Sequence, residues 1–190
     1  MDTRPVASAV AASGLGASLA GSRRQALRAL LGGVGGLALT GAVPAIAEAA
    51  LDADWRLCRK CRGIVGGSAS RPCPAGGEHR VVEAAVYALY YGSDPPPSHE
   101  AGWYWCYECG LLTYQGFGPC PATGDAHVPV SDPYHVEFNQ PPEPDEVGGW
   151  RYCFKCETLF RPKGRKRGVC PIGGRHRGSA DFKYNVYKAP

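Results

Sequence analysis

The residues best suited to chemistry are nine cysteines, which occur as three copies of one pattern that also contains a histidine. Each copy has a Cys-x2-Cys pair, a third cysteine after 10 to 13 intervening residues, and a histidine after five or six more intervening residues. The three sets are Cys58, Cys61, Cys73 and His79; Cys106, Cys109, Cys120 and His127; and Cys153, Cys156, Cys170 and His176. Three thiolates and one imidazole form a complete tetrahedral donor set for zinc. We therefore predict three structural Zn²⁺ ions, each fully coordinated and without an open catalytic position.

The residues that flank the third cysteine of each set support this prediction. A proline follows it directly, at Pro74, Pro121 and Pro171, and stiffens the backbone there. Glycines come next, at Gly76-Gly77, Gly124 and Gly173-Gly174. Because glycine adopts positive φ at little cost, we expect these residues to turn the histidine back toward the thiols.

Other uses of the thiols remain open from the sequence. A disulfide within each Cys-x-x-Cys pair would leave one free cysteine per copy, an odd arrangement in an exported protein. A Cys3His set can also hold iron or a [2Fe–2S] cluster, although the spacing from the third cysteine to the histidine is longer here than in such cluster motifs. A thioredoxin-like redox role is the weakest alternative, because no βαβ pattern surrounds any of the pairs.

The cysteine pattern belongs to a longer internal repeat that predicts the fold. A tryptophan precedes each first pair by three residues, at Trp55, Trp103 and Trp150, and an apolar pair follows it (Ile64-Val65, Leu111-Leu112, Leu159-Phe160). Each copy ends in an alternating segment, at 86–91, 134–138 and 182–187, which is typical of a β-strand. We predict a small all-β, metal-stabilised protein of three tandem zinc-ribbon-like modules, at 52–91, 102–140 and 149–190, because units of about 40 residues need a staple to fold.

Two features bear on how the modules are arranged. Proline-rich connectors at 92–102 and 139–149 favour semi-rigid spacing, yet the repeat also permits packing around a pseudo-threefold axis, and both arrangements stay open. Residues 92–149 contain nine acidic and no basic residues, whereas 150–190 contain eleven basic and two acidic ones. This −9 and +9 contrast either docks the second module on the third or reflects two solvated surfaces.

The N-terminal segment carries the features of an export signal. Arg23-Arg24 precede a mildly apolar, glycine-rich run from Ala29 to Ala47, and Ala45-Ile46-Ala47 offers small residues for cleavage. This resembles a twin-arginine signal peptide over 1–47, which predicts a secreted, periplasmic or cell-envelope protein. A membrane anchor is the alternative, but the run is barely about 19 residues and diluted by glycines. We expect no transmembrane span after cleavage.

The string Trp-x2-Cys-x2-Cys, an apolar pair, and Cys-Pro-x-Gly-Gly-x-His, followed by a Tyr-x-Val strand, resembles a repeat of secreted proteins from actinobacteria and other soil bacteria. The resemblance covers about residues 52–190. It implies export and a non-catalytic repeat role, and it supplies no established ligand. The second module departs from the motif by one extra residue between Cys120 and His127.

Little remains for catalysis once the metal ligands are assigned, since His99 and His135 are the spare histidines and no nucleophile–base set is visible. We therefore predict a binding or scaffold protein rather than an enzyme; an iron–sulfur or redox protein and a secreted enzyme of unknown chemistry are the alternatives. The candidate contact residues are the aromatics Tyr104, Trp105 and Phe154 and the basic residues Arg165, Lys166 and Arg167. These suit a glycan, another protein or an anionic cell-wall polymer, and nucleic acid is not expected outside the cell.

Overall fold

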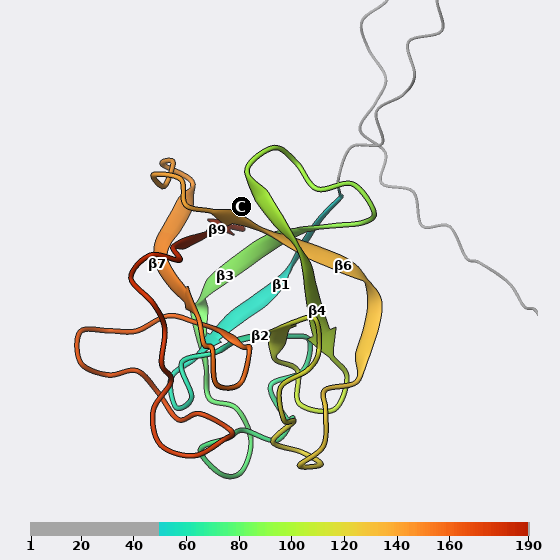
Figure 1. Ribbon diagram of the computed structural model, residues 1–190, viewed down its shortest axis with the longest axis vertical. Helices are drawn as coiled ribbons and strands as arrows, with labels where there is room; N and C mark the ends of the chain where they lie inside the picture. Colours follow the sequence, from blue (N-terminus) through green and yellow to red (C-terminus); the bar gives the residue numbers. More distant parts are fainter. Residues whose placement is uncertain (1–49, 190) are drawn as a thin grey trace, which may run out of the picture. The chain divides into compact units, whose positions relative to one another are not determined.

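The computed structural model describes residues 50–189, which form nine strands and no helix (Figure 1). The strands are β1 (Ala50–Cys58), β2 (Ile64–Gly66), β3 (Val81–Tyr91), β4 (His99–Cys106), β5 (Leu112–Tyr114), β6 (Pro129–Phe138), β7 (Glu146–Tyr152), β8 (Leu159–Phe160) and β9 (Tyr184–Lys188). The predicted all-β class is confirmed. Nothing in this part of the chain is a helix that could cross a bilayer. The predicted signal peptide lies outside the described residues.

Each module contributes the same three strands in the same order. A long strand carries the tryptophan and ends at or next to the first cysteine, a short strand follows the Cys-x-x-Cys turn, and a second long strand follows the histidine. In module 1, β1 pairs antiparallel with both β2 and β3, and modules 2 and 3 repeat this pairing. The register places Leu112 opposite Trp105, as Ile64 lies opposite Leu57, so Leu112 rather than Leu111 corresponds to Ile64.

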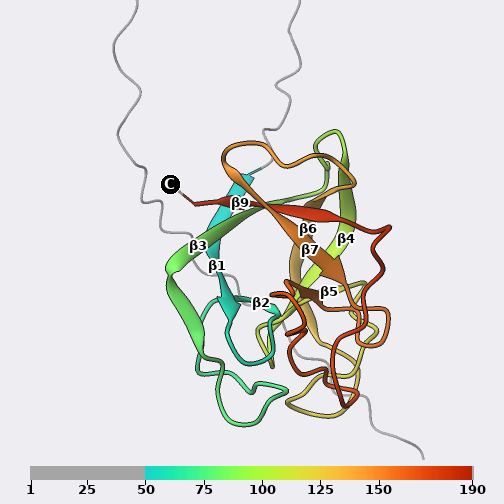
Figure 2. The ribbon, with the colours of Figure 1, turned by 90° about the vertical axis from the view of Figure 1, so that its left-hand side faces the viewer.

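The modules close on one another at both ends of the molecule. At one end the second long strands pair in a cycle, with Tyr90 opposite His135, Glu137 opposite Asn185, and Lys188 opposite Tyr87. At the other end three bridges join the short-strand regions, namely Val65↔Leu111, Thr113↔Thr158 and Gly63↔Phe160. The result is a nearly closed barrel with pseudo-threefold symmetry, in which the loops bearing cysteine and histidine gather at the end away from the β3, β6 and β9 pairing (Figures 1 and 2).

The core is shared among the modules. Each buried tryptophan makes an edge-on contact with a tyrosine of a different module: Trp55 with Tyr134 at 4.9 Å, Trp103 with Tyr184 at 5.3 Å, and Trp150 with Tyr87 at 5.3 Å between ring centroids. These six rings belong to one continuous hydrophobic core. Because each module completes the burial of another module's tryptophan, the three modules are parts of one folding unit and not independent domains.

The proline-rich connectors do not act as spacers, and the opposite charges of modules 2 and 3 do not pair with each other in the described residues. The proline-rich segments form the turns between β3 and β4 and between β6 and β7, within the barrel. Among the described residues the ion pair observed joins Arg56 to Asp54 inside module 1, and none joins modules 2 and 3. Backbone pairing and aromatic packing therefore hold the modules together, and within residues 50–189 no salt bridge joins the acidic and basic halves.

Candidate metal centres

The first two cysteines of each set lie on a tight turn that repeats in all three modules. In module 1 the Arg62 amide donates to the Cys58 carbonyl at 3.0 Å, and the Cys58 amide donates to the Gly63 carbonyl at 3.0 Å. The residue after the second cysteine has positive φ in every copy, at Arg62 (66°), Gly110 (73°) and Glu157 (59°). This left-handed residue reverses the chain so that both thiols face one point.

The third cysteine begins a second turn in which the predicted glycine geometry is confirmed. Gly76, Gly124 and Gly173 have φ of 84°, 84° and 83°. The Gly76 and Gly173 amides each donate to the cysteine three residues earlier, whereas the Gly124 amide donates to Cys120, four residues earlier. The extra residue of module 2 is therefore absorbed within this turn, before the chain reaches His127.

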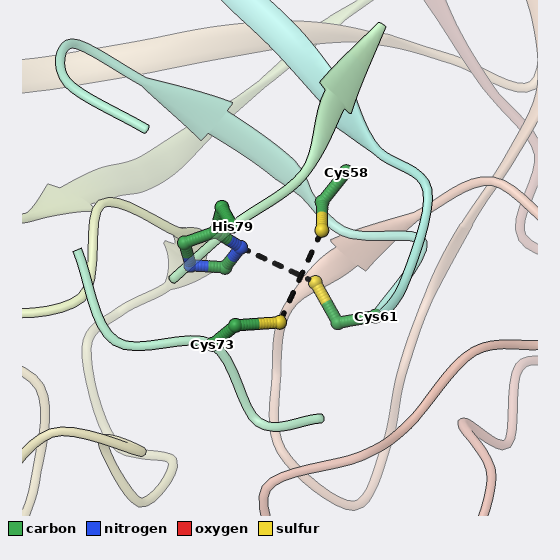
Figure 3. A group of neighbouring side chains, drawn as sticks. All are labelled: Cys58, Cys61, Cys73 and His79. Atoms are coloured by element: carbon green, nitrogen blue, oxygen red, sulfur yellow. Dashed lines mark hydrogen bonds between the residues drawn. The ribbon is translucent and has the colours of Figure 1, made fainter. Parts of the chain in front are cut away.

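The two turns of each module bring the four predicted ligands together, and Figure 3 shows the set from module 1. In every set the ligand atoms lie within 4.8 Å of one another, and all twelve side chains are buried. The Sγ atoms of Cys58 and Cys73 are 3.9 Å apart, as are those of Cys106 and Cys120. The histidine Nδ1 lies 3.6, 3.4 and 3.4 Å from the second cysteine's Sγ in modules 1, 2 and 3.

These separations match the edges of a tetrahedron around a single metal ion. With Zn–S near 2.3 Å and Zn–N near 2.05 Å, the expected S···S edge is about 3.8 Å and the S···N edge about 3.6 Å. None of the nine cysteines, all of which lie in the described part of the chain, forms a disulfide. The three groups are therefore suited to hold three metal ions.

The thiols of each group share protons unequally in the absence of a metal. A hydrogen bond from the Cys109 thiol lowers the pKa of Cys106 to about 3, and a bond from Cys156 does the same for Cys153. The partners Cys109 and Cys156 have raised pKa values, first because of these same bonds and also because of burial. Binding a metal to all three thiolates must therefore release protons, which makes metal affinity depend on pH.

The outer nitrogen of two of the histidines reaches into another module. His79 Nε2 donates to the carbonyl oxygen of Cys109 at 3.0 Å, and His176 Nε2 donates to that of Cys61 at 3.0 Å. Such bonds fix the tautomer and leave Nδ1 free to bind a metal. The Nε2 of His127 has no hydrogen-bond partner among the described residues. Two of the three centres are therefore tied to a neighbouring centre through one side chain.

No family model, curated protein or solved structure matches this chain. The inference of function accordingly rests on the geometry of the three centres and on the surface around them.

The other predicted contact residues lie in different settings. Trp105 is half-buried between modules 1 and 2, where its Nε1 donates to the Gly66 carbonyl at 3.2 Å and the Arg71 guanidinium lies over its ring. Tyr104 is also half-buried, whereas Phe154 is 54% exposed, with Arg177 over its ring at 5.8 Å. The basic residues Arg165, Lys166 and Arg167 are all exposed.

Sequence reasoning missed two sets of residues that hold the centres in place. Gly118 and Gly168, each two positions before a third cysteine, pack so closely that a Cβ there would overlap the carbonyl oxygens of Cys156 and Cys61, respectively. An acidic residue three positions before the tryptophan accepts a hydrogen bond from the next module's tyrosine: Tyr134 to Asp52 at 2.9 Å, and Tyr184 to Glu100 at 2.8 Å. Both sets recur at a constant distance from a repeated cysteine or tryptophan, and this regularity in the sequence could have identified them.

The two spare histidines both lie where the long strands meet. His135 Nε2 donates to the Gly92 carbonyl at 2.9 Å, and burial lowers the pKa of this histidine. His99 Nδ1 donates to the Pro97 carbonyl at 2.9 Å, and its ring stacks on Tyr187. Each histidine therefore bonds to the turn between β3 and β4, a structural role at this end of the barrel.

Proposed function

We propose that this chain is an exported, non-catalytic protein in which three structural zinc ions hold a binding scaffold together at the cell envelope or outside the cell. The observation that carries the proposal is the ligand spacing across the two turns of each module. Thiols from opposite turns are 3.9 Å apart, the edge of one tetrahedron, so a single ion can link the two turns.

Zinc fits this geometry better than a cluster of two irons. A [2Fe–2S] cluster places its two ligand pairs on different iron atoms, which moves the pairs farther apart than the edge of one tetrahedron. Zinc has no redox chemistry, and Cys3His is one of its common structural sets. A single tetrahedral iron remains the competing ion, and it would be recognised by visible absorption.

A non-catalytic role follows from the complete donor sets. Four protein ligands per ion leave no position at which a water or substrate could be activated. The ions instead supply folding free energy to a barrel of 140 described residues, built from modules too small to fold alone. The part of this barrel that is available to other molecules is its exposed surface.

The export part of the proposal rests on Arg23-Arg24 and the apolar run that follows. The test is to express the full chain, with Arg23→Lys and Arg24→Lys as the control variant, in a bacterium that has the twin-arginine route. We expect the wild type in the envelope or the medium and the variant retained inside. Equal export of both would remove the twin-arginine assignment.

The binding part is tested by retention of the zinc-loaded chain on envelope fractions, with the chelated chain as the control. We expect retention that is lost when the metal is removed. A zinc-loaded chain that is retained on no envelope fraction would contradict the proposed role.

A further inference from the structure

A basic groove lies between module 1 and module 3. Its volume is about 1060 Å³, and eight of its eleven lining residues are lysine or arginine, with no acidic residue among them. Three of the eight come from the first cysteine turn of module 1 (Arg59, Lys60, Arg62), and five come from module 3 (Lys163, Arg165, Lys166, Arg167, Arg175). A second hollow, which shares Arg165, Arg167 and Arg175, extends this basic surface to Arg177.

Hydrogen bonds hold the walls of the groove in place. The module 3 wall is a tight hairpin closed by reciprocal backbone bonds between Lys163 and Lys166, at 2.9 and 3.0 Å. This wall is joined to module 1 by the Arg161 amide, which donates to the Arg62 carbonyl at 2.9 Å, and by Arg62 Nε, which donates to the Arg161 carbonyl at 2.8 Å. The bond from His176 to Cys61 spans the same interface. The groove therefore exists only while modules 1 and 3 are closed on each other.

Lys60 and Arg62 donate to backbone carbonyls of the fold, but the charge of the module 3 hairpin is not needed for the fold. No carboxylate forms an ion pair with the groove's basic side chains within the described residues. The corresponding loops of modules 1 and 2, at 66–72 and 115–119, hold a single basic residue between them, Arg71, although they occupy equivalent places in the barrel. Eight like charges gathered in one hollow repel one another and lower stability. A feature that breaks the pseudo-symmetry and opposes folding is best explained by a ligand.

The lining of the groove indicates which ligand chemistry fits. Arginine, five of the eight, binds phosphate oxygens in a bidentate manner. No aromatic side chain lines the groove, and proteins that bind single-stranded nucleic acid stack the bases on such rings. A planar layer of lipid headgroups does not enter a concave hollow. The lining is suited to a narrow, flexible chain that is recognised by its charge alone.

We propose that this groove binds a linear phosphate polymer without bases, either inorganic polyphosphate or a phosphodiester chain of the envelope. The proposal rests on the binding role proposed above and gives that role its ligand class. Since the groove needs modules 1 and 3 closed, its occupancy depends on the metal in both of their centres.

The test compares three forms of the full-length, zinc-loaded chain by titration with long-chain inorganic polyphosphate at several salt concentrations. The groove variant is Arg165→Ser, Lys166→Ser and Arg167→Ser. The control variant is Arg80→Ser, Lys183→Ser and Lys188→Ser, which removes the same charge from exposed sites outside the groove. Arg161 is left unchanged because its Nε donates to the Gly148 carbonyl at 3.1 Å and its removal would disturb the fold.

We expect the wild type and the control to bind equally, and the groove variant to bind at least about 10-fold more weakly. Its salt slope should be lower by about three, because three side chains that each neutralise a phosphate are removed. Metal content is measured on the same samples, so a folded variant with three ions separates this result from a failure of the zinc proposal. Equal weakening in both variants would overturn the proposal, as would tighter binding to a charge-matched single-stranded oligonucleotide or to anionic vesicles.

The titration is repeated with phosphodiester polymer from envelope fractions. Comparing its affinity with that of polyphosphate identifies the source of the phosphate chain. Competition between this polymer and polyphosphate for one site supports the shared chemistry. Failure of polyphosphate to bind the wild type at low salt would overturn the proposed ligand class, even if the chain is still retained on the envelope.

Discussion

His176 of module 3 donates a hydrogen bond from Nε2 to the carbonyl oxygen of Cys61 in module 1, at 3.0 Å. One histidine is thus a predicted metal ligand through Nδ1 and a support for the metal-binding turn of another module through Nε2. His79 makes the equivalent bond to Cys109. Two such bonds therefore connect the three metal centres, and the stabilities of the centres should be coupled.

The centre of module 2 should release its ion first. His127 Nε2 lacks the partner that the other two histidines have, and Glu108 stands where Lys60 and Lys155 hold the second turn of their own modules. Loss of such outer hydrogen bonds lowers metal affinity by about 10- to 100-fold. Under a graded chelator, alkylation followed by mass spectrometry should modify Cys106, Cys109 and Cys120 before the others. Simultaneous modification of all nine cysteines would contradict a difference between the sites.

Gly168→Ala should disrupt the junction of modules 3 and 1. Gly168 has φ of 72°, and the new Cβ would overlap the Cys61 carbonyl, which belongs to the backbone and cannot turn aside. We expect a loss of more than about 3 kcal/mol in unfolding free energy. Gly164→Ala is the matched control, because φ there is 56° and the added Cβ meets nothing within 4 Å, so the expected loss is about 1–2 kcal/mol. Denaturant unfolding gives both values, and equal losses would argue against a tight junction.

Tyr184→Phe should destabilise the barrel more than Tyr87→Phe. Glu100 Oε2 accepts hydrogen bonds from the Tyr184 hydroxyl at 2.8 Å and from Trp103 Nε1 at 3.2 Å, and burial, with Glu100, raises the pKa of Tyr184. A hydrogen bond to a charged group contributes about 1.5–3 kcal/mol. At the equivalent interface Val147 takes the place of the acid opposite Tyr87, so that substitution removes no such bond. Thermal unfolding of the two variants tests the difference.

The repeat predicts more of the centres than of the barrel. Ligand spacing alone placed all twelve donors, and the turn glycines were predicted because their positive φ is a local property. The closure of the modules could not be predicted from local sequence patterns, because it depends on long-range pairs such as Trp55 with Tyr134 and Tyr87 with Lys188. Proline-rich connectors such as 92–102 were misleading for a physical reason: the same composition suits a spacer and a tight turn.

A single module should not fold alone, even with zinc. A fragment of residues 50–91 would leave Trp55 without Tyr134 and the edges of β3 without β6 and β9. We expect its NMR spectrum with zinc to lack the dispersion of a folded β-protein, whereas residues 50–190 should unfold in one transition. A well-dispersed spectrum for the fragment would show that the modules are independent.

The most direct test of three structural zinc ions is the mass of the intact protein under native conditions, followed by its mass after acid denaturation. We predict a native mass that exceeds the denatured one by three zinc ions, with nine free thiols, and the loss of one ion in each of Cys58→Ser, Cys106→Ser and Cys153→Ser. Disulfide bonds in the denatured protein, visible absorption from iron, or a native mass without bound metal would contradict it.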